Sequence, residues 1–203
     1  MIVYAARHSE TFISLRKDIS LPALDWHVIH DGFAMSLLSG FEPVIEENCR
    51  ALILGSMPGV ASLQQQQYYA HPRNVFWPII YELFHIKNDK TYEERCSFLN
   101  ARGIALWDVL KTCKRSGSLD SNIDPGSVSA NDFEKLFAEY ESIRVIFFNG
   151  GAAEKLYKKH VLKRTTDMNY GLIYHRLPSS SPAYAAMSYP EKLKRWQKIK
   201  EYL

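Results

Sequence analysis

Three short apolar runs and a fourth strand-like segment, separated by segments with helical periodicity, limit what this chain can fold into. The apolar runs are residues 51–54, 104–107 and 145–148, and the fourth segment is residues 172–177. Short apolar runs are typical of strands that are buried on both faces, and intervening helices place successive strands parallel. The sequence therefore predicts an α/β fold in which helices cover both faces of a central, mainly parallel, four-stranded sheet.

Helix start signals occur between these runs. Thr91 and Glu94 form a capping box, and Asn131, three residues before Glu134, predicts the N-cap of a later helix. Apolar residues after Asn74 recur at helical spacing, as expected for a helix that packs one face on the sheet.

Two polar stretches are expected at the surface. Residues 113–129 are rich in Ser, Gly and Asp, which predicts a loop. The last helix is predicted from Pro190, and its lysines are expected to form a solvated face: Lys192, Lys194, Lys198 and Lys200.

Length and charge set the broad class. A chain of 203 residues is most simply one domain, which we place at residues 40–203, with residues 1–39 as an extension of uncertain structure. The formal net charge of +3 permits a polyanionic partner without demanding one.

Cysteine usage and hydropathy suggest the compartment. Cys49, Cys96 and Cys113 are odd in number and form no CxxC pair, which argues against a disulfide framework and a zinc site. No stretch approaches the roughly 18 apolar residues of a membrane span, and the N-terminus lacks the pattern of a signal peptide. We expect an intracellular, cytoplasmic protein with no metal and no membrane partner.

Polar residues follow each predicted strand. The turn at residues 55–59, GSMPG, follows the first run, and Asp108, Asn149 and the loop at residues 178–184 follow the other three. The carboxyl ends of parallel strands meet at one edge of a sheet, where ligands bind in open α/β folds. No P-loop, GxGxxG, GxSxG or HExxH motif is present. The sequence predicts a polar cleft suited to a reaction with positioned water.

These motifs resemble a known family. GSMPG, YYAHPRNVFW, GIALWDVL and LPSSSPA, in this order and spacing, are similar to motifs of the uracil-DNA glycosylase superfamily, most closely its hypoxanthine-DNA glycosylase branch, related to the mismatch-specific uracil/thymine glycosylases. The resemblance covers residues 40–203. It implies a three-layer α/β/α fold, excision of a deaminated base from DNA that leaves an abasic site, and no cofactor.

The resemblance assigns two residues to the reaction centre. Tyr69 corresponds to the position where relatives stack an aromatic ring on the flipped base, although a tyrosine there is also expected in a core. Asn74 is assigned as the catalytic residue, which positions water or otherwise supports the transition state. An asparagine before an apolar helix is also a favoured N-cap, and the two roles are compatible.

The turn carries a departure from the family pattern. Backbone N–H groups around Ser56, Met57, Pro58 and Gly59 are expected to bind the base carbonyl and hold the water. Many sister families carry Asp or Asn where Met57 stands, and a thioether cannot activate water. Alternatively, the turn only ends the strand.

Asp108 and Asn149 are the candidate base-reading residues. An ionised carboxylate only accepts hydrogen bonds, so Asp108 would favour the N1–H of hypoxanthine or the N3–H of uracil over the bare N1 of adenine. Asp108 is also interpretable as a cap or ion-pair carboxylate, and Asn149 as a turn residue.

DNA contacts are expected from two segments. Ser179, Ser180 and Ser181 are expected at phosphates, and Tyr184 or Met187 is expected to wedge into the gap left by the base. His71 and Arg73 are further candidate phosphate contacts, although either is at least as readily interpreted as a surface residue. Lys111, Lys114 and Arg115 follow Asp108 and are better candidates for phosphate contacts.

No lysine lies in the motif loops, so we expect a monofunctional glycosylase without strand cleavage. We also expect the protein to be a monomer. The alternatives are a non-catalytic nucleic-acid-binding module on the same fold and a hydrolase of free nucleosides.

Overall fold

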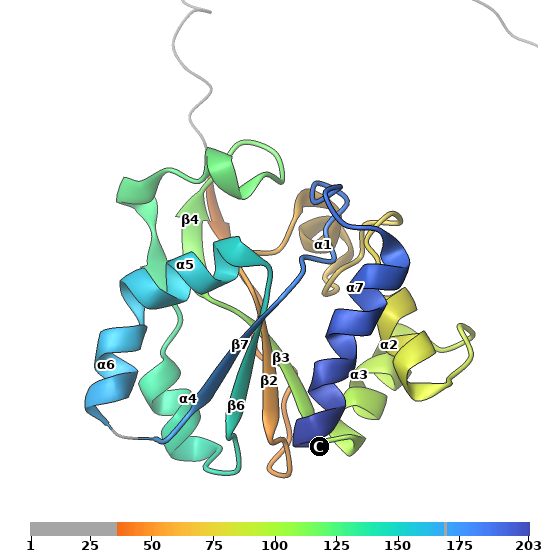
Figure 1. Ribbon diagram of the computed structural model, residues 1–203. Coiled ribbons are helices and arrows are strands. Elements are labelled where there is room, and N and C mark those ends of the chain that lie inside the picture. Colours follow the sequence, from red (N-terminus) through yellow and green to blue (C-terminus); the bar gives the residue numbers. More distant parts are fainter. Residues whose placement is uncertain (1–35, 169) are drawn as a thin grey trace, which may run out of the picture. The chain divides into compact units, whose positions relative to one another are not determined.

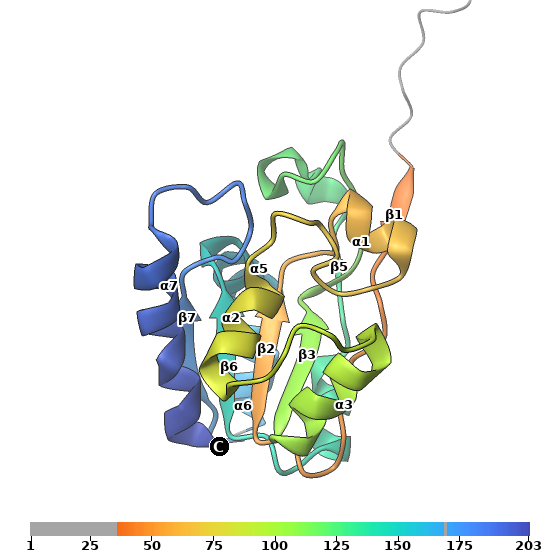
Figure 2. The same cartoon turned by 90° about the vertical axis from the view of Figure 1, so that its right-hand side faces the viewer.

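The central sheet of the molecule has four parallel strands. The computed structural model describes residues 36–168 and 170–203. Their main sheet has the order β3-β2-β6-β7, in which every neighbouring pair is parallel. The strands are β2 (Ala51–Gly55), β3 (Ile104–Asp108), β6 (Val145–Asn149) and β7 (Ile173–Leu177). All four predicted strands are confirmed, and their carboxyl ends share one edge (Figure 2).

Alternate residues of each strand face opposite sides of this sheet. In β2, Leu52 and Leu54 belong to one apolar cluster, whereas Ala51 and Ile53 belong to the other. This alternation follows from the strand period of two, and both faces are covered because all these residues are buried. The predicted three-layer α/β/α arrangement is therefore present.

The helix α1 (Val60–Gln65) follows the turn after β2, and the other six α-helices of the described part divide between the two faces. One face carries α2 (Phe76–Phe84), α3 (Tyr92–Ala101) and α7 (Tyr189–Trp196), and the other carries α4 (Phe133–Glu139), α5 (Gly151–His160) and α6 (Leu162–Asp167), as Figure 1 shows. The capping box of Thr91 and Glu94 is confirmed at the start of α3. The short 3-10 helix η3 (Gln197–Tyr202) follows α7.

A second, antiparallel sheet replaces part of the predicted surface loop. It pairs β1 (Leu37–Ser39) with β4 (Leu110–Lys114), and β4 with β5 (Ser129–Ala130). The loop prediction for residues 113–129 is wrong at both ends, because Cys113 is a buried residue of β4 and the stretch ends in β5. Two short 3-10 helices, η1 (Asp120–Asn122) and η2 (Pro125–Ser127), lie between them.

Two local predictions are also wrong. The side chain of Asp132, not Asn131, caps α4 by accepting from the N–H of Lys135, while Asn131 Nδ2 donates to the carbonyl of Asp108 at 2.8 Å. Lys192 is not solvated: it is only 6% exposed, and its ammonium donates to the Tyr184 carbonyl at 2.8 Å. Packing of α7 against the preceding loop covers this lysine.

The folded part begins slightly before the predicted domain boundary at residue 40. Residues 1–35, most of the expected extension, lie outside the described residues, and β1 already belongs to the folded part. No helix of the described part is long and apolar enough to cross a membrane.

Candidate active site

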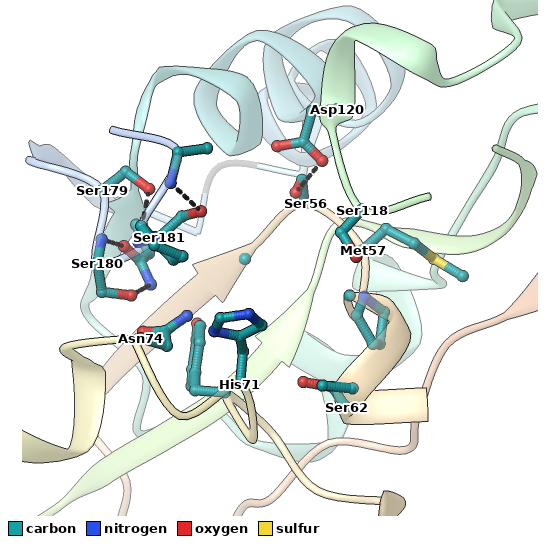
Figure 3. A pocket seen from close by; sticks show the side chains of 18 of the residues that line it. Ser56, Met57, Ser62, His71, Asn74, Ser118, Asp120, Ser179, Ser180 and Ser181 are labelled. Carbon is teal, nitrogen blue, oxygen red and sulfur yellow. Dashed lines mark hydrogen bonds between the residues drawn. The ribbon is translucent and has the colours of Figure 1, made fainter. Parts of the chain in front are cut away.

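A cavity of about 380 Å³ opens where the strands of the main sheet end. Each strand contributes to its wall: β2 through the turn after Gly55, β3 through Asp108, β6 through Asn149 and β7 through the loop after Leu177. Tyr69, Asn74 and Asp108 line this one cavity. Figure 3 shows its rim, with the serines 179–181 on one side, Asp120 and Ser56 on another, and Asn74 beside His71.

Two residues that line the cavity each have a buried polar atom without a hydrogen-bond partner among the described residues, Asp108 Oδ2 and Tyr69 Oη. Both side chains approach Gly55, where a Cβ atom would lie 2.1 Å from Asp108 Oδ1 and 3.4 Å from Tyr69 Oη. Only glycine fits there. Unsatisfied buried polar groups are costly, so their persistence in a cavity is typical of a site that a ligand completes.

Burial controls the electrostatics of this region. Asp108 is 3% exposed, and burial, with a smaller contribution from Asp120, raises its pKa from 3.8 to about 7 against the opposing effect of Arg115. Burial followed by the Asp108 charge also raises the pKa of Tyr69. Asp108 therefore changes its protonation state near neutral pH.

Tyr69 is held in an unusual backbone conformation. Its φ is +58°, a left-handed value that is rare for an aromatic residue, and its ring stacks on Phe76 with centroids 3.9 Å apart and planes 19° apart. One face of the tyrosine ring is thus covered by α2. This arrangement fixes an aromatic wall in the cavity before any ligand arrives.

Arg115 stabilises the turn at residues 55–59 from the side that faces the protein interior. Arg115 is 5% exposed, and its guanidinium donates to the carbonyls of Met57 and Pro58. The Met57 side chain lies in the apolar core with Leu110, so the thioether does not form the reactive surface of the turn. Arg115 is therefore not a DNA phosphate contact, which corrects that prediction, whereas Lys111 and Lys114 are exposed.

Asn74 acts at the start of α2. Its Oδ1 accepts from the N–H of Phe76 at 3.0 Å, which satisfies one of the free donors of the helix and fixes the side chain at the cavity wall. Next to it, His71 Nδ1 accepts from the N–H of Arg73 at 3.1 Å. Asn74 lies at the cavity as predicted, but the N-cap of α2 is Val75, so the predicted N-cap is wrong by one residue even though the Asn74 side chain binds the first N–H of the helix.

Asn149 and Ser180 bind each other. Asn149 Nδ2 donates to Ser180 Oγ and Asn149 Oδ1 accepts from the N–H of Ser180, each at 2.8 Å. Ser180 is 1% exposed, so its hydroxyl fastens the serine loop to the end of β6 and does not face solvent. Ser179 and Ser181 remain partly exposed at the cavity.

The structure brings most predicted residues to this cavity. Those that line it are Ser56, Met57, Pro58, Gly59, Tyr69, His71, Arg73, Asn74, Asp108, Asn149, Ser179, Ser180 and Ser181. Tyr184 and Met187 do not; they line an adjoining groove with Arg176 and Arg195.

Sequence reasoning missed one wall of the cavity. Ser118, Leu119 and Asp120 line it from the stretch that was predicted as a surface loop. Ser56 Oγ donates to Asp120 Oδ1 at 2.7 Å (Figure 3), and Ser118 Oγ accepts from the N–H of Val60 at 2.9 Å. No local pattern marks these residues, because their role depends on β4 returning the chain to the turn. Among the described residues, no group of His, Cys, Asp or Glu is arranged to hold a metal ion.

The family model of the uracil DNA glycosylase superfamily matches residues 42–203, which include every residue that lines the cavity. The chain belongs to the uracil DNA glycosylase superfamily. Two relatives named hypoxanthine DNA glycosylase are similar in sequence. One, from Methanosarcina acetivorans, is 41% identical over 115 residues, or 56% of this chain and 72% of the relative. The other, from Methanosarcina barkeri, is 40% identical over 114 residues, or 55% and 70%.

A solved structure supports the same family. The solution NMR structure of a Methanosarcina acetivorans protein, provisionally named a uracil DNA glycosylase, matches with a TM-score of 0.67 and 35% identity, covering 81% of this chain and 96% of that one. The resemblance inferred from four short motifs is thereby confirmed at the level of the superfamily. A member of this superfamily has DNA as its substrate.

Proposed function

We propose that this chain is a monofunctional DNA glycosylase that flips hypoxanthine out of DNA and hydrolyses its bond to deoxyribose, leaving an abasic site. Uracil and xanthine are further candidate substrates. The observation that carries the proposal is the single cavity that joins an aromatic wall, a buried carboxylate and a helix-capping amide at the carboxyl edge of the sheet. The two relatives named hypoxanthine DNA glycosylase support the choice of base.

The cavity suits one extruded base. Its volume of about 380 Å³ lies in the range typical of small-molecule pockets. A purine in it would stack on the face of Tyr69 opposite Phe76, at roughly 1 to 3 kcal/mol per base. Glycosylases take their target out of the duplex in this way, as the base is otherwise out of reach.

The buried carboxylate supplies discrimination between damaged and normal bases. Ionised Asp108 accepts from the N1–H of hypoxanthine, whereas adenine presents a bare N1 that leaves the carboxylate unpaired. Because the pKa of Asp108 is about 7, this selectivity is fully developed only above neutral pH. We assign this role to Asp108, with Asn149 supporting the serine loop beside it.

Bond cleavage leaves positive charge on the sugar and negative charge on the base, which the cavity stabilises. In our assignment, Asn74 positions the attacking water and the backbone N–H groups of the turn at Ser56–Gly59 hold the base carbonyl. The residues known to line the cavity include no lysine, which supports hydrolysis without strand cleavage. Ser179, Ser181, His71 and Arg73 at the rim are the proposed phosphate contacts.

Two residues of the adjoining groove are proposed to reach the duplex. Tyr184 is 37% exposed and Met187 lies beside it, so the pair is proposed to fill the gap left by the base. One chain supplies all of these groups. We therefore propose that the glycosylase acts as a monomer, a state that light scattering during gel filtration measures.

The test uses duplexes that carry one deoxyinosine, deoxyuridine or deoxyxanthosine. With enzyme in excess, we expect alkali-labile sites at deoxyinosine and no strand break before alkali. No alkali-labile product from any of the three duplexes would refute the proposal. Salt-dependent binding without turnover would instead favour a non-catalytic module, and cleavage of free inosine alone would favour a nucleoside hydrolase.

A further inference from the structure

We propose that Asp120 is the general base that takes the proton from the attacking water. This assignment rests on the proposed glycosylase function and adds a catalytic residue to it. Asp120 lies outside the four motif loops, in the wall that β4 brings to the turn. A general base needs a basic lone pair that no other group occupies.

Asn74 cannot take a proton. An amide positions water through hydrogen bonds, but it is not basic at neutral pH. Its oxygen is also already engaged with the N–H of Phe76. The Met57 side chain is packed in the core, and a thioether would not serve as a base in any case. The titratable cavity residues that remain for this role are His71, Asp108 and Asp120.

The hydrogen bonding of the His71 imidazole does not suit a general base. Its Nδ1 accepts from the N–H of Arg73, so the lone pair of Nδ1 is occupied. The neutral ring then carries its proton on Nε2, which makes that nitrogen a donor. His71 therefore suits a contact to an anionic oxygen better than proton abstraction.

Asp108 is in the wrong place for water. It is 3% exposed, its Oδ2 is buried without a partner, and it lies against Gly55 and the Tyr69 hydroxyl in the deep part of the cavity. This surrounding suits the edge of a base. The sugar of a flipped nucleotide stays nearer the mouth, because it remains joined to the DNA backbone.

Asp120 combines a fixed position with access to water. Its side chain is 35% exposed, its Oδ1 accepts from Ser56 Oγ at 2.7 Å, and Arg115 Nη1 lies 3.8 Å from the same oxygen. One carboxylate oxygen is thus anchored to the turn, and Oδ2 has no hydrogen-bond partner among the described residues. Asp120 is thus held by one oxygen, while the other is free to accept a proton.

The chemical step balances without a cofactor. The water oxygen forms a bond to C1′ of the deoxyribose, and the C1′–N9 bond breaks with its electron pair leaving on the base. The water proton passes to the Asp120 carboxylate and later to solvent, while the base takes a proton from solvent. Asn74 supports this step from its own side of the cavity, beside His71 (Figure 3).

Several charged or titratable groups surround Asp120 and affect its titration. Burial raises its pKa, while the Ser56 hydrogen bond and then the Arg115 charge oppose this. The groups that lie near it or face it across the cavity are Arg115, Asp108, Cys113, His71 and Arg73.

The deciding experiment measures single-turnover excision from a deoxyinosine duplex by Asp120→Asn across a range of pH. We expect the rate to fall about 100-fold or more, while affinity for a duplex with a stable abasic analogue stays the same. The matched control is Asp124→Asn, since Asp124 carries the same charge in the same stretch but only caps η2 through the N–H of Gly126. This control should excise at the wild-type rate.

The pH profile separates a base from a structural residue. Because Asp108 also ionises near neutral pH, the profiles are compared in an Asp108→Asn background. There the rate should still rise with pH as Asp120 ionises, and Asp120→Asn should lose this rise. Ser56→Ala removes the hydrogen bond that lowers the pKa of Asp120, so it should move the midpoint to higher pH and keep most of the rate above it. A rate within about threefold of wild type in Asp120→Asn, or a midpoint unmoved in Ser56→Ala, would overturn the assignment. An inactive wild type would instead refute the proposed function itself.

Discussion

Replacing Asp108 by Asn should stabilise the protein at high pH while it weakens excision. Asp108 is 3% exposed, and its Oδ2 has no partner among the described residues. Burial and the charge of Asp120 raise its pKa from 3.8 to about 7, whereas an unfolded chain returns it to about 3.9. Between these values the folded state binds more protons than the unfolded state, so the free energy of unfolding falls as pH rises.

The size of this effect follows from the shift. A difference of about three pKa units corresponds to ~4 kcal/mol in full, of which roughly 3 kcal/mol should develop between about pH 5 and pH 8. Asn has no such titration, so the stability difference between Asp108→Asn and wild type should grow by that amount over the same range.

Urea unfolding at several pH values, followed by tryptophan fluorescence, measures this difference. The same variant should excise hypoxanthine more slowly and discriminate less against adenine, since its amide offers both a donor and an acceptor. A stability difference that does not change with pH would refute the reasoning, because it would mean that the carboxylate is solvated or paired. Asp132→Asn, at the exposed cap of α4, is the control and should lack the pH-dependent gain.

Three further changes test other contacts of the site. Gly55→Ala places a Cβ 2.1 Å from Asp108 Oδ1, so that carboxylate must move, and single-turnover excision should slow by about 100-fold; an unchanged rate would contradict this. Asn74→Ala should slow excision by about 100-fold with unchanged DNA affinity, and should lower the free energy of unfolding by about 1 kcal/mol through the lost cap. Lys192→Met leaves the Tyr184 carbonyl without its donor, so proteolysis between residues 178 and 187 should accelerate and DNA affinity should fall about tenfold; equal affinity would show that the loop keeps its conformation.

Three strands of the main sheet were predictable because they are short apolar runs that are buried on both faces: β2, β3 and β6. The strand β7 is partly exposed and contains His175 and Arg176, and each of the four strands leads into the cavity wall. This places the candidate site without any side-chain detail. The capping box of α3 was also predictable, because both of its hydrogen bonds join residues that are close in sequence.

The second sheet was not predictable from local pattern. In β4, exposed polar residues alternate with buried ones such as Cys113, so the short polar stretch at its end has the composition of a loop. The same tertiary return buries Arg115 behind the turn and brings Asp120 to Ser56, 64 residues away in sequence. These contacts depend on long-range packing, which residue spacing does not reveal. The cap of α4 was misplaced by one residue because Asn131 and Asp132 are both good caps.

The most direct test of base excision quantifies the free base that the protein releases from DNA. Matched duplexes with one deoxyinosine or one deoxyadenosine are incubated with excess protein, and released bases and abasic sites are quantified by mass spectrometry. We predict free hypoxanthine in equal molar amount to abasic sites from the first duplex, and no adenine from the second. Equal release from both duplexes, or none from either, would contradict the account.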